Sequence, residues 1–169
     1  MNNKKLIIGI ILVILIVIIF SFINYFSNRI NEIAAVNLYK EIIDLTVLEN
    51  KGLTNDAEYI SLDINTLVDP LSSKRLSDNS INEIVSYCKK HNEKVLKKGY
   101  EQLISEGLGD STKLKGVLIS INLRSKSFNT AIITSKIYSG NLGSSMVSYK
   151  IKYNGNSWSY SENGEKVQS

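Results

Sequence analysis

The feature that most constrains this chain is an apolar segment near its start, residues 6–26, which contains no charged side chain. As an α-helix with about 1.5 Å rise per residue, this segment extends roughly 31 Å and matches a bilayer core of about 30 Å. The apolar region of a secretory signal peptide is shorter, about 7–15 residues. Downstream, only Ala34-Ala35 offers a weak cleavage motif. We therefore expect residues 6–26 to form a retained transmembrane helix in contact with the lipid bilayer.

The distribution of charge predicts the orientation of this helix. Lys4 and Lys5 precede it without any acidic residue, whereas Arg29 and Lys40 after it are interleaved with carboxylates. Because basic residues next to a short end favour the cytoplasmic side, we expect residues 1–5 to form a cytoplasmic tail. The sequence thus predicts a single-pass protein of the cell membrane with its C-terminal domain outside.

The composition of the region after residue 26 limits its partners. This region carries 18 of the 20 basic residues and all 16 acidic residues, which leaves a net charge near +2. No nucleic acid is expected as a partner, because such domains are strongly basic. Cys88 is the only cysteine, so the chain has no internal disulfide. Abundant Ile, Asn and Lys with little Ala and Pro is typical of an AT-rich bacterial coding sequence.

Two helices are predicted before the strands. Apolar residues at three- and four-residue spacing over residues 27–50 predict a helix that continues from the membrane, packs on the domain and ends at Lys51-Gly52. A short strand near residues 59–62 and an irregular segment follow. A long helix is then predicted over residues 81–106, with Ser80 as its N-cap. One face of that helix would carry Lys90, Lys94 and Lys97. This basic face could attract anionic groups, or it could simply be the solvated face of the helix.

From residue 115 onward the apolar period changes from 3.6 to 2, which predicts four antiparallel strands. Asn154-Gly155 predicts a type I′ hairpin turn before the last strand. We therefore expect an α+β domain over residues 27–161, in which helices pack on one face of a curved four-stranded antiparallel sheet. Residues 162–169 are expected to form a frayed tail.

Few residues in this sequence suggest chemistry. Gly140–Gly143, read as GNLG, lies between two predicted strands without the helix that a phosphate-binding loop requires, and is interpreted as a strand connection. Cys88 and His91 are spaced C-x-x-H, but zinc needs three or four ligands. Cys88 is expected in the core and His91 in solvent. No catalytic residue, metal ligand or cofactor site is predicted.

The last hairpin gathers aromatic side chains, and two interpretations remain open. They could pair across the strands and stabilise the sheet, or they could form a surface for a partner. The residues of this candidate partner surface are Tyr149, Tyr153, Trp158 and Tyr160.

The predicted long helix and the meander that ends VSYKIKYNGNSWSY resemble the cone-shaped NTF2-like (cystatin-like) α+β fold. The resemblance covers residues ~80–161 and concerns architecture. It implies an extracytoplasmic domain on one N-terminal anchor, as in scaffold subunits of bacterial secretion and conjugation machines. Enzymatic members use Asp/His pairs in a pocket, and His91 on an outer helix face does not match that arrangement.

The expected function is binding or scaffolding without catalysis, by an anchored domain of a bacterial envelope transport or secretion assembly. Its partner would be another envelope protein or a second copy of the chain. One alternative is a small-ligand-binding or enzymatic NTF2-like pocket. Another is a pilin-like subunit, although position 14 is Ile14 where a prepilin would carry an acid.

Overall fold

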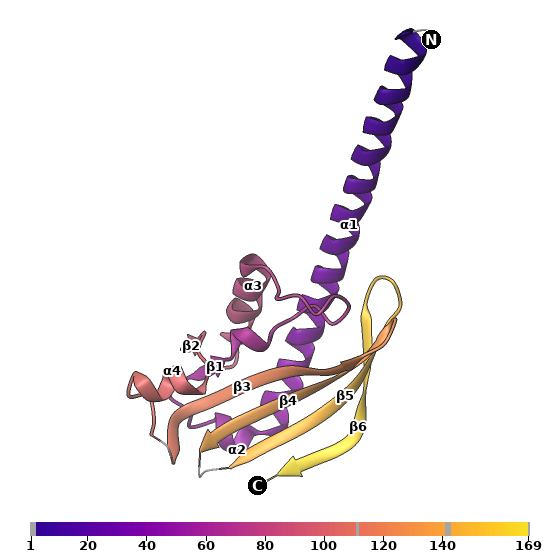
Figure 1. Cartoon of the computed structure of the whole chain (residues 1–169). Coiled ribbons are helices and arrows are strands. Elements are labelled where there is room, and N and C mark those ends of the chain that lie inside the picture. Colours follow the sequence, from indigo (N-terminus) through magenta and orange to yellow (C-terminus); the bar gives the residue numbers. More distant parts are fainter. Residues whose placement is uncertain (1–2, 111, 141–142, 169) are drawn as a thin grey trace.

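The computed structural model of the chain describes residues 3–110, 112–140 and 143–168. A single helix, α1 (Asn3–Glu49), extends as a rod from the domain and carries the N-terminus away from it (Figure 1). Within the described residues, α1 is the one helix long and apolar enough to cross a membrane, judged by length and composition. Its most apolar window is not buried by any other part of the chain.

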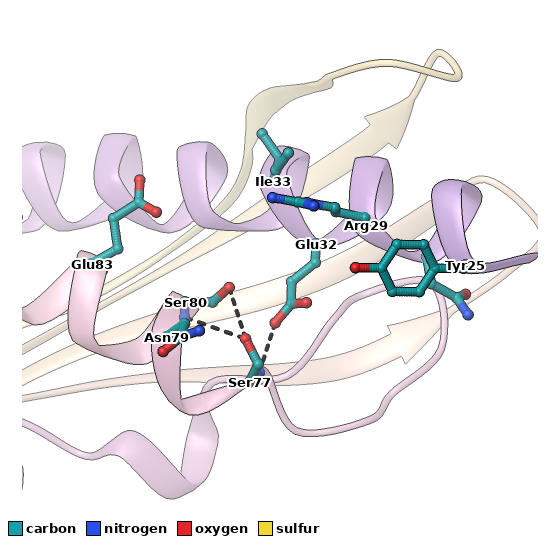
Figure 2. Close-up of a pocket in the computed structure, with 9 residues that line it drawn as sticks. Tyr25, Arg29, Glu32, Ile33, Ser77, Asn79, Ser80 and Glu83 are labelled. Atoms are coloured by element: carbon teal, nitrogen blue, oxygen red, sulfur yellow. Dashed lines mark hydrogen bonds between the residues drawn. The ribbon is translucent and has the colours of Figure 1, made fainter. Parts of the chain in front are cut away.

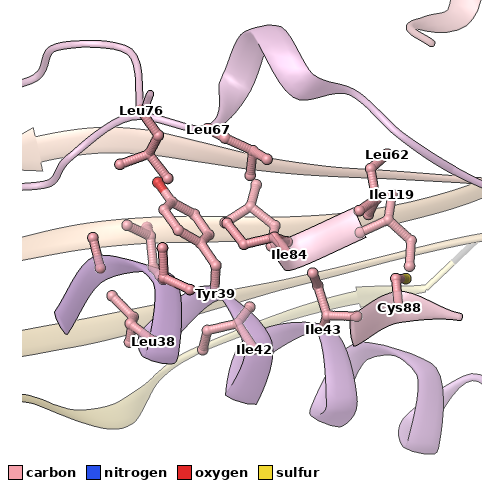
Figure 3. Packing of buried hydrophobic residues seen from close by; sticks show 14 of the residues in the cluster. Leu38, Tyr39, Ile42, Ile43, Leu62, Leu67, Leu76, Ile84, Cys88 and Ile119 are labelled. Carbon is pink, nitrogen blue, oxygen red and sulfur yellow. The ribbon is translucent and has the colours of Figure 1, made fainter. Parts of the chain in front are cut away.

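The C-terminal half of α1 belongs to the domain core, as the sequence predicted. Leu38, Tyr39, Ile42 and Ile43 are fully or almost fully buried, and they pack against the sheet and α3 (Asp78–Cys88) (Figure 3). The predicted stop at Lys51-Gly52 is misplaced. The helix ends at Glu49, and Gly52 lies inside the short helix α2 (Lys51–Thr54).

Over the described residues the sheet has six strands, not the four expected, in the order β2-β1-β3-β4-β5-β6. The pairs from β3 to β6 are antiparallel, while β1 runs parallel to both β2 and β3. Residues 162–168, which we expected to fray, continue the last strand. The strand bounds are β1 (Ile60–Leu62), β2 (Val95–Leu96), β3 (Lys113–Lys126), β4 (Thr130–Gly140), β5 (Ser144–Tyr153) and β6 (Trp158–Gln168).

The prediction of one long helix over residues 81–106 is wrong. Helix α3 ends at Cys88, β2 follows, and α4 (Tyr100–Ser105) begins after Gly99. Residues between α3 and α4 form a strand instead of a helix because they pair with β1, where Val95 lies opposite Ile60 in a parallel ladder. The N-cap of α3 is Ser77 rather than Ser80, since the Ser77 hydroxyl accepts the Ser80 N–H.

The hairpin between β5 and β6 is where the sequence placed it, with a different turn. The Asn154 N–H donates to the Ser157 carbonyl, and only Gly155, at φ +99°, has a left-handed backbone. A type I′ turn needs positive φ at both central residues, so the predicted type I′ turn at Asn154-Gly155 is wrong. Gly140 is the last residue of β4 and Gly143 lies just beyond it, and both have positive φ, as expected of a strand connection. The residues between them, 141–142, lie outside the described residues.

Helices α1 and α3 cover one face of the sheet, and the main core lies between these two layers (Figures 1 and 3). The predicted alternation in the first two strands of the meander is confirmed, because Val117, Ile119, Ile133 and Ile137 are buried in this core. A smaller cluster on the opposite face includes Leu103 of α4. The helices therefore leave most of one sheet face uncovered.

Candidate binding surfaces

The four aromatic residues of the candidate partner surface lie on the helix-covered face of the sheet. Tyr149 is 1% exposed and Trp158 8% exposed, and both belong to the main core. Tyr153 is partly buried, and its hydroxyl donates to Asn31 Oδ1 of α1 at 2.8 Å. Tyr160, at 38% exposure, is the only one of the four that is exposed rather than buried or partly buried. The structure thus places three of them in or beside the core.

Two polar atoms of this aromatic group are buried without a hydrogen-bond partner in the described structure, the hydroxyl of Tyr149 and the indole N–H of Trp158. Burial raises the pKa of Tyr149 to about 12, and the nearby carboxylates Glu49 and Glu162 add to the effect. The Tyr149 hydroxyl therefore stays protonated at every physiological pH.

The three lysines predicted to share a helix face do not share a helix. The α3 helix has ended before Lys90, and Lys94 and Lys97 flank β2 in extended or irregular backbone. Lys90 Nζ is paired with Asp44 Oδ2 at 2.7 Å, and Lys97 donates to Asn82. The proposed basic face is therefore not present as a helix surface.

A polar cluster that the sequence did not reveal joins α1 to the end of α3. Asp44 accepts hydrogen bonds from Tyr87 and Lys90 on one oxygen, and its other oxygen lies 2.7 Å from His91 Nε2. Partial burial alone would raise the pKa of Asp44, but hydrogen bonds from Lys90, Tyr87 and His91 lower it below its usual range. His91, expected in solvent, is instead partly buried in this contact.

Cys88 is fully buried beside this cluster, as the sequence predicted. Burial, with a further effect of Asp44, raises the pKa of its thiol to about 12. A thiol of this kind is a poor nucleophile, because the thiolate is the reactive species.

A cleft of about 570 Å³ lies between α1 and the start of α3, close to the apolar segment (Figure 2). Glu32 Oε1 accepts the Ser77 backbone N–H at 2.6 Å and so completes the N-terminus of α3. Burial alone would raise the pKa of Glu32. The hydrogen bonds from Ser77 and Ser80 outweigh burial and lower this pKa below its usual value. Tyr25 and Arg29 line the side of the cleft nearer to the apolar segment.

The uncovered sheet face, opposite α1, is rich in hydroxyl groups and lysines. Strand register places Thr130 beside Lys152, Ser120 beside Lys136, and Lys150 between Ile132 and Ser161. None of these three lysines has an ion-pair partner in the part of the chain that the structure describes. We call Lys136, Lys150 and Lys152, with the neighbouring hydroxyl side chains, the open sheet face.

At one end of the open sheet face, α4 and the sheet border an open pocket of about 450 Å³. The rings of Tyr100 and Tyr138 meet edge to face at 5.7 Å, and Lys136 Nζ lies 5.5 Å from the centre of the Tyr138 ring. Asp63 adds a carboxylate to the same pocket. Its charged and aromatic groups can contact a polar ligand or a side chain of a partner.

Among the residues that the structure describes, no group of three or more His, Cys, Asp or Glu side chains could hold a metal ion. Comparison of the chain with protein-family models, with curated proteins and with solved structures gave no match. The function must therefore be argued from the surfaces described above.

Proposed function

We propose that the chain is a single-pass bacterial membrane protein whose extracytoplasmic domain binds or scaffolds another envelope protein, or a second copy of itself, without catalysis. Residues 6–26 would cross the membrane with residues 1–5 in the cytoplasm. The assembly served by this domain would be one of envelope transport or secretion.

One observation carries this proposal: α1 is both the apolar rod and a wall of the domain core. Ala35 and Ile42 are fully buried in the core, while Val13 and Ile16, on the same unbroken helix, are exposed. A flexible linker would allow a domain to sample many positions above a membrane. A continuous helix instead fixes the height and direction of the domain, which suits a scaffold.

The open sheet face supplies the binding surface in this proposal. Its lysines, which have no ion-pair partner among the described residues, and its hydroxyl groups can donate hydrogen bonds, and the lysines can attract acidic groups of a partner. The helix layer on the opposite face supports the resemblance to the NTF2-like fold, and the cone remains part of the proposal.

Site-specific photo-crosslinking in cells tests this role. A photoreactive residue at Lys150 should give a discrete crosslinked species, whereas one at Glu41, exposed on α1, should not. The species should disappear when Lys136 and Lys152 are changed to Glu, because the surface then repels the same partner. Equal products from both positions, or a product unaffected by the charge reversals, would contradict a role for the open sheet face.

Binding of a small polar ligand is the second candidate function, favoured by Asp63, Tyr100 and Lys136 around the 450 Å³ pocket. The pocket is open to solvent, so it supports contact with a group presented from outside. A raised melting temperature with a small anionic ligand, lost in Lys136→Ala, would support this role.

A further inference from the structure

We infer that the tip of the β3–β4 hairpin, residues Ser127–Thr130, docks on the lipid bilayer through Phe128 and rests the domain on the membrane that anchors it. This inference depends on the proposed membrane anchoring by α1. It concerns a second contact with the bilayer that the anchor itself does not require.

Phe128 has no structural reason to lie where it does. The Ser127 N–H donates to the Thr130 carbonyl at 2.7 Å, so Phe128 and Asn129 are the two central residues of a tight turn. Turns of this kind favour Gly, Asn, Asp, Pro and Ser for their backbone preferences. Phe128 is 96% exposed, the most of any large hydrophobic side chain in the described structure. It contributes nothing to the core and leaves its apolar ring in water.

Hydrogen bonds place this tip close to the membrane-proximal part of α1. Asn129 accepts the Tyr153 backbone N–H at 2.7 Å, and the Tyr153 hydroxyl donates to Asn31 at 2.8 Å. Asn31 is five residues beyond Phe26, the last residue of the apolar segment. At about 1.5 Å per residue this separation is roughly 7.5 Å along the helix. The headgroup region beyond each side of the hydrocarbon core has a similar thickness, about 5–7 Å.

In this inference, the end of the sheet that carries the β3–β4 turn faces the bilayer. Figure 1 shows the β3–β4 and β5–β6 hairpins at the end of the sheet from which α1 leaves the domain, and the C-terminus at the opposite end. The contact between Thr46 Oγ1 and Ser135 Oγ, 2.6 Å, lies farther from the membrane along both α1 and β4. Both hairpin turns, β3–β4 and β5–β6, therefore lie on the side of the domain where α1 leaves toward the apolar segment.

The charges around the tip suit an anionic membrane surface. Residues 122–132 and 150–161 contain four basic residues and no Asp or Glu: Arg124, Lys126, Lys150 and Lys152. All four are exposed. In the adjoining loop, the carboxylate of Asp69 accepts hydrogen bonds from the Leu71 N–H and the Ser72 hydroxyl. An aromatic ring at the boundary between headgroups and acyl chains, surrounded by basic residues, is the combination that binds peripheral segments to anionic bilayers.

Quenching by brominated lipid measures this contact in the full chain. The protein is reconstituted in vesicles of phosphatidylglycerol and dibrominated phosphatidylcholine, with Trp158→Phe removing the only tryptophan. Single tryptophans are then introduced as Tyr25→Trp, Phe128→Trp and Leu48→Trp. Tyr25 lies at the end of the apolar segment, while Leu48 is exposed on α1 about 33 Å beyond Phe26.

We expect Phe128→Trp to lose emission almost as strongly as Tyr25→Trp, and Leu48→Trp to lose none. If Tyr25→Trp is quenched and Phe128→Trp is not, the tip stands off the bilayer and the inference fails, leaving Phe128 for a protein partner. If Tyr25→Trp is also unquenched, the membrane anchoring itself is wrong.

A second readout avoids altering the buried Trp158. Phe128→Cys, labelled with an environment-sensitive fluorophore, should shift its emission to the blue on addition of the same lipid to detergent-solubilised protein. Native Cys88 is buried and should not take the label. An emission maximum that stays at its value in water would overturn the inference independently of the tryptophan series.

Discussion

At the level of one residue, Tyr149 is a core residue that the sequence also allowed as part of a partner surface. Its ring fills the core between α1 and the sheet, yet its hydroxyl has no hydrogen-bond partner in the described structure. The alternation of β5 predicted correctly that Val147, Tyr149 and Ile151 share a face, and all three are buried. Alternation alone cannot decide which face a helix covers, so the same residues were also compatible with a partner surface.

Tyr149→Phe should stabilise the domain or leave it unchanged. Removing a buried hydroxyl that lacks a partner relieves a desolvation cost, so we expect a gain of up to about 1 kcal/mol in the free energy of unfolding. Thermal unfolding of the full chain in nanodiscs, followed by near-ultraviolet circular dichroism, measures this change. Tyr153→Phe is the matched control and should destabilise the domain, because its hydroxyl donates to Asn31. A clear loss of stability in Tyr149→Phe would show that its hydroxyl is satisfied.

Cys88 should resist thiol reagents while the domain is folded. It is fully buried and its pKa is raised to about 12, so little thiolate forms and reagents cannot reach it. Mass spectrometry after maleimide treatment should find the thiol unmodified in native protein and fully modified in urea. Rapid modification without denaturant would contradict the position of α3.

At the level of whole elements, the segment from α3 to α4 shows which interactions a local sequence pattern cannot indicate. Residues 81–106 have enough apolar residues at helical spacing to predict one long helix. The deciding interaction is non-local, since Val95 and Leu96 complete a parallel ladder with β1. Asp44 and His91 are likewise far apart in the sequence, and no local pattern indicates that they meet.

The Asp44 cluster should make stability depend on pH under acidic conditions. Because the folded-state pKa of Asp44 is lowered, its contribution is complete above the ordinary aspartate pKa of about 3.9 and is lost as the pH falls through the lowered value. Asp44→Asn should cost about 1 kcal/mol at neutral pH, since the carboxylate is partly exposed. The variant should also lose less stability than the native chain between neutral pH and pH ~3. Asp56→Asn, at an exposed turn, is the control and should match the native chain in a melting series.

Two glycines test the packing of β1 against β3. A Cβ at Gly116 would clash with the Tyr59 carbonyl oxygen, so Gly116→Ala should separate the strands and cost about 1–3 kcal/mol. Gly52 in α2 has open space around it, and Gly52→Ala should stabilise the helix by up to about 1 kcal/mol. Chemical denaturation of both variants gives the comparison. Equal effects would contradict the close approach of Tyr59 to Gly116.

For the molecule as a whole, the sequence predicted the order of the parts well: apolar segment, helix, then an antiparallel meander. These predictions rest on local periodicity, which survives folding because each element buries one face. The short strands β1 and β2, the divided second helix and the choice of covered face depend on contacts between distant segments. The open sheet face could not be predicted from the sequence, because tertiary contacts decide which face of the sheet α1 covers.

The central claim is that α1 anchors the domain outside the cell membrane, and labelling of Leu48→Cys in intact cells tests it most directly. Leu48 is exposed on α1 beyond the apolar segment, while the native Cys88 is buried and provides an unlabelled background. A membrane-impermeant maleimide should label Leu48→Cys in intact cells and leave the native chain unlabelled. Labelling of Leu48→Cys only after the membrane is permeabilised would place the domain in the cytoplasm and contradict the account.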